Sequence, residues 1–381
     1  MTDSKVSLAR GKTFYEKNFP GTSPSDWNSW QWQLKNAFRS QEQIEKIISL
    51  STGERDYFQQ KKKSFPVRIT PYYASLLCEN TSPLRRTVLP DLRETLFLPS
   101  EVADPLTEEK LSPVPAIIHR YPDRVVFVTT FQCATYCRYC TRKRVVGRKK
   151  YSNDRQEWQK GVDYIRANSG ITDVLISGGD PLILDDESLA WLLSRIREIP
   201  HVKLIRIGTK TPVNLPQRFQ QSLIDILKKY APLIISLHVT HVSELTPEMS
   251  AVCEQLVENG ILIGSQTVLL KGINDSVEQI RELMLRLLWL RVRPYYLLHC
   301  DAVQGSGQFR TSIQKGLDLI EGLRGEVSGY AIPQFVVDPI GGGGKIVLHP
   351  ENIVRHEADG VWLKNWQGQQ VFVAEPDSTT L

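Results

Sequence analysis

Hydrophobic and polar residues follow one repeating pattern over the middle of the chain, from Arg124 to about residue 323. Short apolar runs (VVFVTTF, TDVLISGGD, VKLIRIGT, PLIISLHV, ILIGSQTVLL and RPYYLLHC) each precede a segment whose apolar residues recur every three or four positions. Six such units at intervals of about 30 residues predict a parallel sheet with helices packed against it. Because a closed TIM barrel has eight units, we expect a partial TIM-like (βα)6 barrel, an α/β fold whose functional groups lie at the C-terminal ends of the strands.

The segments on either side of the repeat follow other patterns. Residues 21–63 predict short helices, the first of them capped by Ser25 or Asp26, and residues 65–115 form a Pro-rich connector. After the repeat, PQFVVD predicts a further strand, and the tail from about Glu351 predicts a short β-rich extension. We therefore expect three parts: an N-terminal helical arm and connector (1–115), the barrel (116–328) and a C-terminal segment (329–381).

Composition adds few constraints. The chain is 41% hydrophobic and 23% charged, which is typical of a globular protein, and its net charge of +5 does not by itself indicate nucleic-acid binding. The N-terminus has no apolar signal core, and no apolar run approaches the length of a membrane span. The six cysteines are not spaced like a disulfide framework, so we expect a reducing, cytoplasmic location.

Three of the cysteines, Cys133, Cys137 and Cys140, lie directly after the first predicted barrel strand. Thiolates in this CxxxCxxC spacing can hold three irons of a [4Fe–4S] cluster and leave the fourth iron open. The amino and carboxylate groups of S-adenosylmethionine can chelate such an iron, and an electron from the cluster can then cleave its C5′–S bond. The alternative is a zinc loop, which usually needs a fourth protein ligand, and the sequence offers none nearby. The triad therefore predicts a radical S-adenosylmethionine enzyme.

Other residues at predicted strand ends could contact the cofactor at this cluster. Gly178, Gly179 and Asp180 follow the second strand, where bare backbone and a carboxylate could meet an amino group. The alternative for this loop is a tight turn with a helix cap. Three further side chains could contact the adenine or the ribose, or could be merely structural: Tyr139, His238 and Gln266.

A second cofactor signal lies near the C-terminus, where Gly341, Gly342, Gly343 and Gly344 precede Lys345. Four glycines allow a turn that other residues could not adopt and allow a flat ligand to approach the backbone. A partly desolvated lysine at such a turn can form a Schiff base with an aldehyde such as pyridoxal phosphate. The alternative is a flexible loop with a solvated lysine. A P-loop is disfavoured because no Ser or Thr follows the lysine.

Taken together, these blocks resemble the lysine 2,3-aminomutase family. The resemblance runs from about Trp27 to Leu348 and includes HRYPDRVVFVTTFQCATYCRYCTRKR, SGGDPL, RIGTKTPVNLPQR, GSQTVLLKGIND, HCDAVQGSGQFRT and VVDPIGGGGKI. It implies an isomerase that interconverts L-lysine and L-β-lysine by radical 1,2-amino migration. It also implies that the cysteine triad holds a [4Fe–4S] cluster with S-adenosylmethionine, and that Lys345 is the catalytic residue that binds pyridoxal 5′-phosphate covalently.

The resemblance further implies roles for five charged residues. Arg120 and Arg124 would face the anionic groups of pyridoxal phosphate, and Arg142 would bind the carboxylate of the substrate. Asp301 and Asp338 match the positions that receive the ε-ammonium of lysine. A buried ammonium is costly unless it is paired, so two converging carboxylates would select lysine against glutamate.

The chain also departs from the family pattern. Tyr139 replaces a histidine that is usual in the lysine-fermenting relatives, and no cysteine follows Cys300, whereas those relatives carry a C-terminal zinc-binding cluster. A zinc-linked oligomer is therefore in doubt, although a homo-oligomer is still expected. The expected partners are the amino-acid substrate and reduced flavodoxin or ferredoxin as the electron donor, without a membrane or nucleic acid.

Several alternatives stay open at this point. A related aminomutase modifies elongation factor P, but those enzymes tend to read CRYCFRR where this chain reads CRYCTRK. Glutamate or arginine could replace lysine as the substrate. The basic run from Arg142 to Lys150 could bind RNA, although it lies beside the cysteine triad. A non-catalytic iron–sulfur module would leave Lys345 and the two aspartates without a role.

Overall fold

The computed structural model describes residues 2–60, 65–78, 82–148, 154–357, 360–365 and 367–374. Within them, a nine-stranded sheet has its strands in chain order. The strands are β1 (Ile117–Tyr121), β2 (Arg124–Thr130), β3 (Asp173–Gly178), β4 (Leu204–Thr209), β5 (Leu233–His238), β6 (Leu262–Leu269), β7 (Arg293–His299), β8 (Gln334–Val337) and β9 (Ile346–Leu348). β2 to β8 pair in parallel, whereas β1 and β9 pair antiparallel to β2 and β8. The predicted parallel repeat is confirmed.

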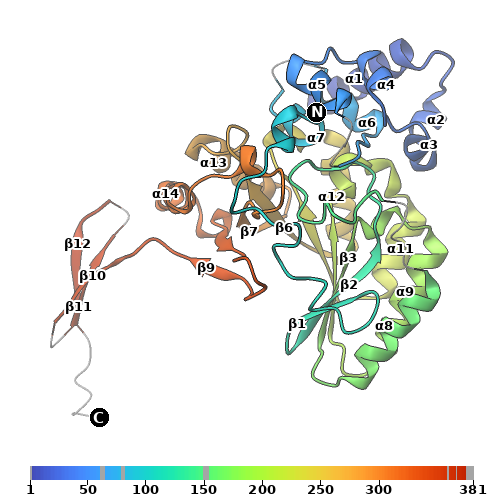
Figure 1. The fold of residues 1–381 in the computed structure, drawn as a ribbon. Helices are drawn as coiled ribbons and strands as arrows, with labels where there is room; N and C mark the ends of the chain where they lie inside the picture. The colour runs from blue at the N-terminus through green and yellow to red at the C-terminus, as the bar shows by residue number, and fades with distance from the viewer. Residues whose placement is uncertain are drawn as a thin grey trace.

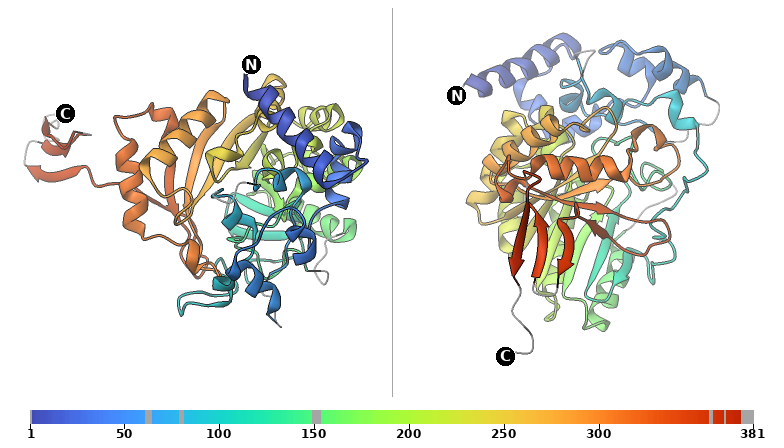
Figure 2. Two further views of the ribbon diagram at one scale, coloured as in Figure 1. Left: turned by 90° about the horizontal axis from the view of Figure 1, so that it is seen from above. Right: turned by 90° about the vertical axis from the view of Figure 1, so that its left-hand side faces the viewer.

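Long helices follow six of the parallel strands and cover the outer side of the curved sheet (Figures 1 and 2). They are α8 (Arg155–Ala167), α9 (Asp186–Arg197), α11 (Gln221–Lys229), α12 (Pro247–Glu258), α13 (Val277–Trp289) and α14 (Ile313–Leu323). Each buries a stripe at helical spacing, as Leu189, Leu192, Leu193 and Ile196 of α9 illustrate. Because β1 and β9 are the two edges of the sheet, the barrel is open, as predicted.

Short helical segments shape the loops between these elements. They are η2 (Pro181–Ile183), α10 (Thr211–Asn214), η3 (Pro216–Arg218), η4 (Val242–Glu244), η5 (Gly307–Phe309) and η6 (Gly329–Ala331). Most of the loops that follow the C-terminal ends of the parallel strands carry one of them, so this end of the barrel is built from ordered turns. Within the described residues, no helix combines the length and the apolar character that a membrane span requires.

The N-terminal arm lies over one end of the barrel (Figure 1). It contains α1 (Thr2–Asn18), α2 (Pro24–Trp27), α3 (Trp30–Lys35), α4 (Gln41–Glu45), α5 (Thr52–Gln59), α6 (Pro71–Ala74), α7 (Arg85–Val88) and η1 (Leu92–Thr95). The sequence did not predict α1. The predicted cap was wrong: the N-cap of α2 is Ser23, and Asp26 completes its capping box from inside the helix.

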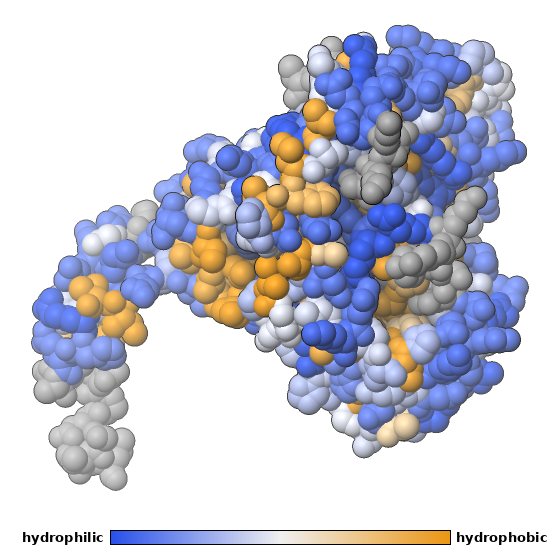
Figure 3. Space-filling view, in the orientation of Figure 1, coloured by the Kyte–Doolittle hydropathy of each residue, from blue (hydrophilic) through white to orange (hydrophobic). Residues whose placement is uncertain are grey.

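The C-terminal segment divides into two parts. Its first strands, β8 and β9, belong to the main sheet. The predicted β-rich tail follows as β10 (Ile353–Glu357), β11 (Gly360–Lys364) and β12 (Gln370–Ala374), an antiparallel sheet that projects from the body (Figure 1). Hydrophobic side chains gather on this projection (Figure 3), among them the exposed Ile353, Val354, Val371 and Val373.

Candidate functional site

A cavity of about 1140 Å³ lies inside the open barrel, and every residue that the sequence predicted for the site lines it. The predicted residues are Arg120, Arg124, Cys133, Cys137, Tyr139, Cys140, Arg142, Gly178, Gly179, Asp180, His238, Gln266, Asp301, Asp338 and Lys345. They come from the N-terminal strands, the parallel strand ends and the C-terminal glycine loop. The topology therefore gathers residues that are separated by more than 200 positions of sequence.

The three cysteines lie in the loop after β2, between two small hydrophobic clusters. Cys133 and Cys140 pack against Phe65, Tyr136 and Val146, and Cys137 packs against the cluster that contains Tyr139 and Phe309. Burial is the largest cause that raises the pKa of all three thiols, to about 11 for Cys140. Binding of iron must therefore displace protons from these sulfurs.

The cysteine loop offers thiol ligands for a cluster. Among the described residues, no three His, Cys, Asp or Glu side chains converge closely enough to hold one ion. The ligands of a [4Fe–4S] cluster bind different irons, so their sulfurs need not converge on one point. Three thiols that face one cavity, shielded by apolar side chains, are the donor set that such a cluster requires.

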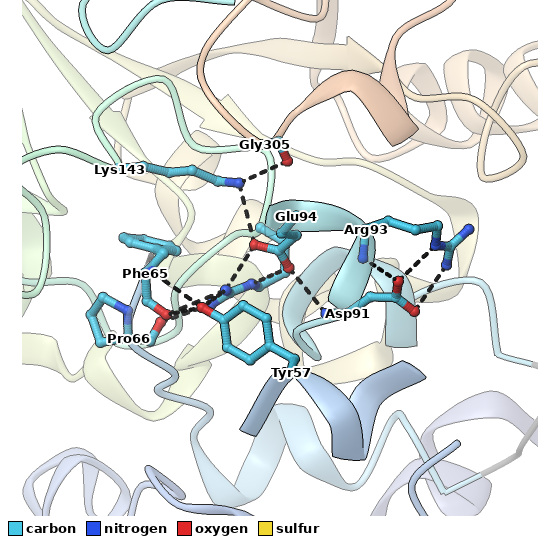
Figure 4. A network of polar contacts seen from close by, with 9 residues as sticks. Tyr57, Phe65, Pro66, Asp91, Arg93, Glu94, Lys143 and Gly305 are labelled. Carbon is cyan, nitrogen blue, oxygen red and sulfur yellow. Dashed lines mark hydrogen bonds and ion pairs between the residues drawn. The ribbon is translucent and has the colours of Figure 1, made fainter. Parts of the chain in front are cut away.

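An arginine inside the triad, Arg138, anchors this loop to the N-terminal arm through Tyr57, Pro66 and Glu94, which Figure 4 labels. Arg138 is fully buried, and its Nε and Nη2 donate to the two carboxylate oxygens of Glu94 at 2.8 Å each. Nη1 donates to the carbonyl of Pro66 at 2.8 Å, and Nη2 also donates to the hydroxyl of Tyr57 at 3.0 Å. Lys143 reaches the same carboxylate at 3.3 Å. The buried charge is thus paired and hydrogen-bonded, which fixes the loop.

Gly178 ends β3, and Gly179 after it contacts the loop that leads to the cysteines. A Cβ on Gly179 would lie 2.1 Å from the carbonyl oxygen of Gln132, so no other residue fits without a backbone shift. Asp180 is buried, and its carboxylate accepts hydrogen bonds from Thr209 (2.7 Å) and from the backbone of Lys210 (2.8 Å) and Leu182 (3.1 Å). The helix cap that was the alternative for Asp180 is therefore present, as the N-cap of η2. Contact of Asp180 with the cofactor stays a prediction.

Tyr139, His238 and Gln266 form one side of the cavity. The rings of Tyr139 and His238 meet edge to face at 6.1 Å, and the Tyr139 hydroxyl hydrogen-bonds Thr240 at 2.7 Å. Burial first, then the positive charge of Lys210, lowers the pKa of His238 to about 4. Its Nε2 has no hydrogen-bond partner among the described residues. A neutral imidazole with an unused polar atom suits a polar ligand such as the ribose of a nucleoside.

Gln266 was predicted to end its strand, and this was wrong. β6 continues to Leu269 because Thr267, Val268 and Leu269 still pair with β7. Gln266 nevertheless lies beside His238 in register, since the two residues are partners between β5 and β6. The two side chains therefore share one level of the barrel.

The glycine loop holds Lys345 at the wall of the cavity. Gly341, Gly342 and Gly344 have φ angles of 100°, 78° and 90°, so the turn requires glycine, as predicted. A Cβ on Gly344 would lie 3.0 Å from the hydroxyl of Tyr121, which accepts a hydrogen bond from the backbone N–H of Lys345 at 2.7 Å. The side chain that comes close to the backbone at Gly344 is therefore that of Tyr121, a residue that the sequence analysis missed.

The two predicted aspartates line the same cavity, close enough for their charges to interact. The carboxylate of Asp338 pairs with both Lys345 Nζ and Arg120 Nη1, the latter at 3.3 Å. Burial, and then the negative charge of Asp338, raises the pKa of Asp301 to about 6. The positive charge of Lys345 lowers the pKa of Asp301, but burial and the charge of Asp338 outweigh it. A further cationic group between the two carboxylates would relieve their repulsion.

Arg142 is held in place by Glu108, a connector residue that the sequence analysis missed. Nε of Arg142 donates to both carboxylate oxygens at 3.0 Å, and Nη2 donates at 2.8 Å. Nη1 donates to Ser177 Oγ (3.2 Å) and to the carbonyl of Gly178 (2.9 Å). Burial alone would raise the pKa of Glu108, but the charges of Arg142, Arg144 and Arg120 lower it. The guanidinium is therefore oriented before any ligand arrives.

Arginines at the β1–β2 end of the cavity provide positive charge for an anionic cofactor. Arg124 pairs with Asp123 at 2.9 Å, and its guanidinium lies 4.0 Å from the ring centre of Tyr121. Nε of Arg120 is buried without a hydrogen-bond partner in the described part of the chain. Arg206 and Arg293, which the sequence analysis did not single out, line the same cavity. Arg206 pairs with Asp173 at 2.9 Å, and Arg293 donates to backbone carbonyls. The buried Nε of Arg120 is therefore the donor best placed for an anionic group such as the phosphate of pyridoxal phosphate.

Sequence reasoning also missed a buried ion pair beneath the cysteine loop. Lys210 lines the cavity and binds Glu244 at 2.7 Å, and Glu244 accepts a hydrogen bond from Tyr73 of the arm at 2.6 Å. Lys210 Nζ also donates to Thr240 at 3.0 Å. Lys210 follows β4 in the GTKTP block, and its position after a strand was the only available signal.

Comparison with known proteins matches two regions of the chain to families. Residues 127–284 match the radical SAM superfamily, and residues 320–380 match the family described as lysine-2,3-aminomutase. L-lysine 2,3-aminomutase of Clostridium subterminale is 43% identical over 364 residues, which cover 95% of this chain and 88% of that one. That of Methanococcus maripaludis is 45% identical over 92% of this chain and 82% of its own. Glutamate 2,3-aminomutase of Clostridioides difficile is 40% identical over 91% of this chain and 82% of its own length.

Proposed function

The chain belongs to the lysine 2,3-aminomutase family of radical S-adenosylmethionine enzymes, and we propose that it interconverts L-lysine and L-β-lysine by moving the α-amino group to C3. The observation that carries the choice of substrate is the carboxylate pair of Asp301 and Asp338, which line one cavity with the cysteine triad and Lys345. A lysine side chain would neutralise this pair, whereas the side chain of glutamate would add a third negative charge.

The cofactors of this family are a [4Fe–4S] cluster, S-adenosylmethionine and pyridoxal phosphate. When bound, they supply a carbon-centred radical that removes hydrogen and an aldehyde that binds amines covalently. Cys133, Cys137 and Cys140 would hold the cluster, and His238 with Gln266 would bind the nucleoside of S-adenosylmethionine. Arg120 and Arg124 would bind the phosphate of the pyridoxal cofactor.

Lys345 and Asp338 would prepare the site for the substrate. In the structure the Lys345 ammonium is the counter-ion of Asp338. Covalent attachment of Lys345 would remove that ammonium and leave Asp338 paired with Arg120 alone, so one carboxylate oxygen could receive the ε-ammonium of lysine. The ε-ammonium would thus take the place of the Lys345 ammonium beside a buried carboxylate that Arg120 also pairs.

Arg142 would bind the carboxylate of the substrate. Glu108, Ser177 and Gly178 accept bonds from four of the five N–H groups that a guanidinium carries. The side chain is therefore fixed in one orientation at the cavity wall, and its remaining N–H is the one we assign to the substrate. The buried surroundings of Arg142 and Glu108 would also help to exclude water from the site.

Three predictions about partners and location belong to the same proposal. A low-potential electron donor, reduced flavodoxin or ferredoxin, is needed because a cluster must receive one electron for each activation. The exposed apolar residues of the β10–β12 sheet support a homo-oligomer, since such a surface is usually covered. We retain the cytoplasmic location as the one in which free cysteines and an iron–sulfur cluster persist.

A competition assay tests the choice of substrate. The anaerobically reconstituted protein is given equal concentrations of L-lysine, L-glutamate and L-arginine, and the β-amino acids are separated and quantified. We expect β-lysine to be the main product. Preferential formation of β-glutamate or β-arginine would overturn the substrate assignment while leaving the aminomutase reaction in place.

A further inference from the structure

A second, smaller cavity of about 330 Å³ opens on the surface beside the cysteine loop. It is lined by residues of the N-terminal arm and by the segment that follows the triad: Arg39, Tyr57, Phe58, Phe65, Pro66, Val67, Gly147 and Arg148. Arg39 and Arg148 are exposed, whereas Tyr57 and Phe65 are buried and form an aromatic floor. We call this feature the arginine pocket.

One aromatic side chain separates the arginine pocket from the main cavity. Phe65 lines both cavities, and it is the only residue common to the two sets among the described residues. Cys133 and Cys140 pack against the cluster formed by Phe65, Tyr136 and Val146. An iron–sulfur cluster bound by the cysteine triad would therefore lie one layer of side chains from this part of the surface.

The layer between the two cavities is rigid. The Tyr57 hydroxyl donates to the carbonyl of Phe65 at 2.6 Å and accepts from its N–H at 3.1 Å. The guanidinium of Arg138, which lies between two of the cysteines, is 4.9 Å from the ring centre of Phe65. Gly147 fits closely, since a Cβ there would lie 2.8 Å from the ring of Tyr136. The route from the pocket to the triad is thus a fixed, close-packed layer.

The charge of the arginine pocket has one sign. Its lining in the described part of the chain includes two arginines and no Asp or Glu. Behind the rim, Arg68 lies close enough to Arg39 for their like charges to interact. A concave site with clustered guanidinium groups attracts acidic partners and speeds their association.

We propose that the arginine pocket is the docking surface for an acidic protein that carries a low-potential, one-electron redox centre. The proposal rests on the proposed function, since it assigns this surface to the electron that the cluster requires. One electron leaves the reduced centre of the donor, which is oxidised by one, and enters the cluster, which is reduced by one. No covalent bond forms or breaks. The acidic surface of the donor pairs with Arg39 and Arg148, which brings its redox centre to the Phe65 layer.

Charge reversal at the rim tests the proposal. The holoenzyme, the Arg39→Glu and Arg148→Glu variants and the double variant are mixed with reduced flavodoxin or with dithionite. The rate of cluster reduction is followed by its absorbance and by electron paramagnetic resonance. Arg195→Glu is the matched control, because Arg195 is an exposed arginine on the outer helix α9. β-Lysine formation with each reductant is measured in parallel.

We expect the double variant to be reduced by flavodoxin at least about tenfold more slowly at low salt, with a smaller difference at high salt. Reduction by dithionite and the Arg195→Glu control should be unchanged. If the double variant is reduced more slowly to the same extent by both reductants, or as fast as the unmodified protein by flavodoxin, the proposed docking surface is wrong. Salt-sensitive tRNA binding that the double variant loses, with flavodoxin reduction unchanged, would assign the pocket to RNA instead. Normal cluster reduction without β-lysine formation would refute the proposed function but not this surface.

Discussion

Lys345 and Asp338 form an ion pair across the turn that joins β8 to β9. The pairing follows from the strand register, because Val337 on β8 is the partner of Ile346 on β9. Asp338 follows Val337 and Lys345 precedes Ile346, so the strand pairing brings Asp338 and Lys345 together at the start and end of the glycine loop. The lysine proposed to bind pyridoxal phosphate is thus held by a carboxylate proposed to bind the substrate.

Replacement of Lys345 separates its two roles. Lys345→Ala should abolish the visible absorbance of bound pyridoxal phosphate and reduce β-lysine formation to background, because no amine remains for covalent attachment. Lys345→Arg keeps a cation for Asp338 but cannot form the covalent link, so it should lose the absorbance as well. Both variants should retain the iron content of the unmodified protein. Persistence of the absorbance in either variant would contradict the assignment.

Asp338→Asn tests the proposed ammonium site. Removing one of two carboxylates from a buried cation site should raise KM for lysine roughly 100-fold or more. Slow cleavage of S-adenosylmethionine without substrate, measured as 5′-deoxyadenosine, should stay within about twofold, because Asp338 is not proposed to contact that cofactor. If cleavage falls as far as lysine turnover does, Asp338 serves the whole site and not the substrate alone.

The raised pKa of Asp301 predicts the direction in which the stability of the protein changes with pH. Its pKa is raised from 3.8 to about 6, so the folded protein binds more protons than the unfolded chain between these values. Stability of the ligand-free protein should fall as pH rises through this window, by up to about 3 kcal/mol. Asp301→Asn should remove that loss in urea unfolding at pH 8. A variant that is less stable at pH 8, with an unchanged pH slope, would contradict the raised pKa.

The same titration should control substrate binding. Asp301 must be ionised to receive an ammonium group, so the affinity for lysine should weaken as pH falls below about 6. Isothermal titration with lysine at several pH values measures this effect, and Asp301→Asn should flatten the profile. The variant would then be more stable but a poorer binder of lysine, which is typical of residues that serve a site.

Glu94 tests the anchor of the cysteine loop. Glu94→Gln leaves Arg138 buried without its carboxylate, which should lower the free energy of unfolding by about 3–5 kcal/mol. Iron bound per chain after reconstitution should also fall, since the loop would lose its fixed position. The control is Glu198→Gln, which breaks the exposed pair with Arg195 and should cost less than about 1 kcal/mol. Equal effects of the two substitutions would exclude an anchoring role for Glu94.

Gly179 tests the contact between the β3 loop and the loop that leads to the cysteines. Gly179→Ala places a Cβ against the backbone of Gln132 and should lower both iron content and thermal stability. Gly208→Ala is the matched control at the neighbouring strand, because its nearest atoms lie at an ordinary 3.6 Å. Iron content equal to that of Gly208→Ala would show that the loop can shift without cost.

Much of this fold could be predicted from local pattern. The alternation of β-branched runs and helical stripes predicted the six parallel strands from β2 to β7, because each element buries its own periodic face. The segment PQFVVD predicted the further strand β8. The helix α1 was missed because its apolar residues do not form one stripe (TDSKVSLARGKTFYEKN). The end of β6 was misplaced because an apolar run such as VLL does not show where pairing stops.

Only the site residues that belong to sequence motifs, or to blocks that resemble the family, could be predicted. Residues of the triad, the glycine loop and the strand ends were found, and the topology brings them to one cavity. The partners that fix them were not found. Glu94 lies 44 positions before Arg138, and Glu108 lies 34 positions before Arg142. Pairing between distant segments leaves no periodic signal, so a charged residue in the connector looks like any solvated one.

The central claim is that an amino group moves within one lysine molecule, and an isotope measurement tests it most directly. The protein is reconstituted anaerobically with iron, sulfide, pyridoxal phosphate and S-adenosylmethionine, reduced, and incubated with L-lysine that carries ¹⁵N at the α-amino group. The product is analysed by mass spectrometry and by ¹⁵N nuclear magnetic resonance. We expect β-lysine with the label retained on C3. Absence of β-lysine, or β-lysine whose C3 nitrogen has exchanged with unlabelled ammonia, would contradict the account.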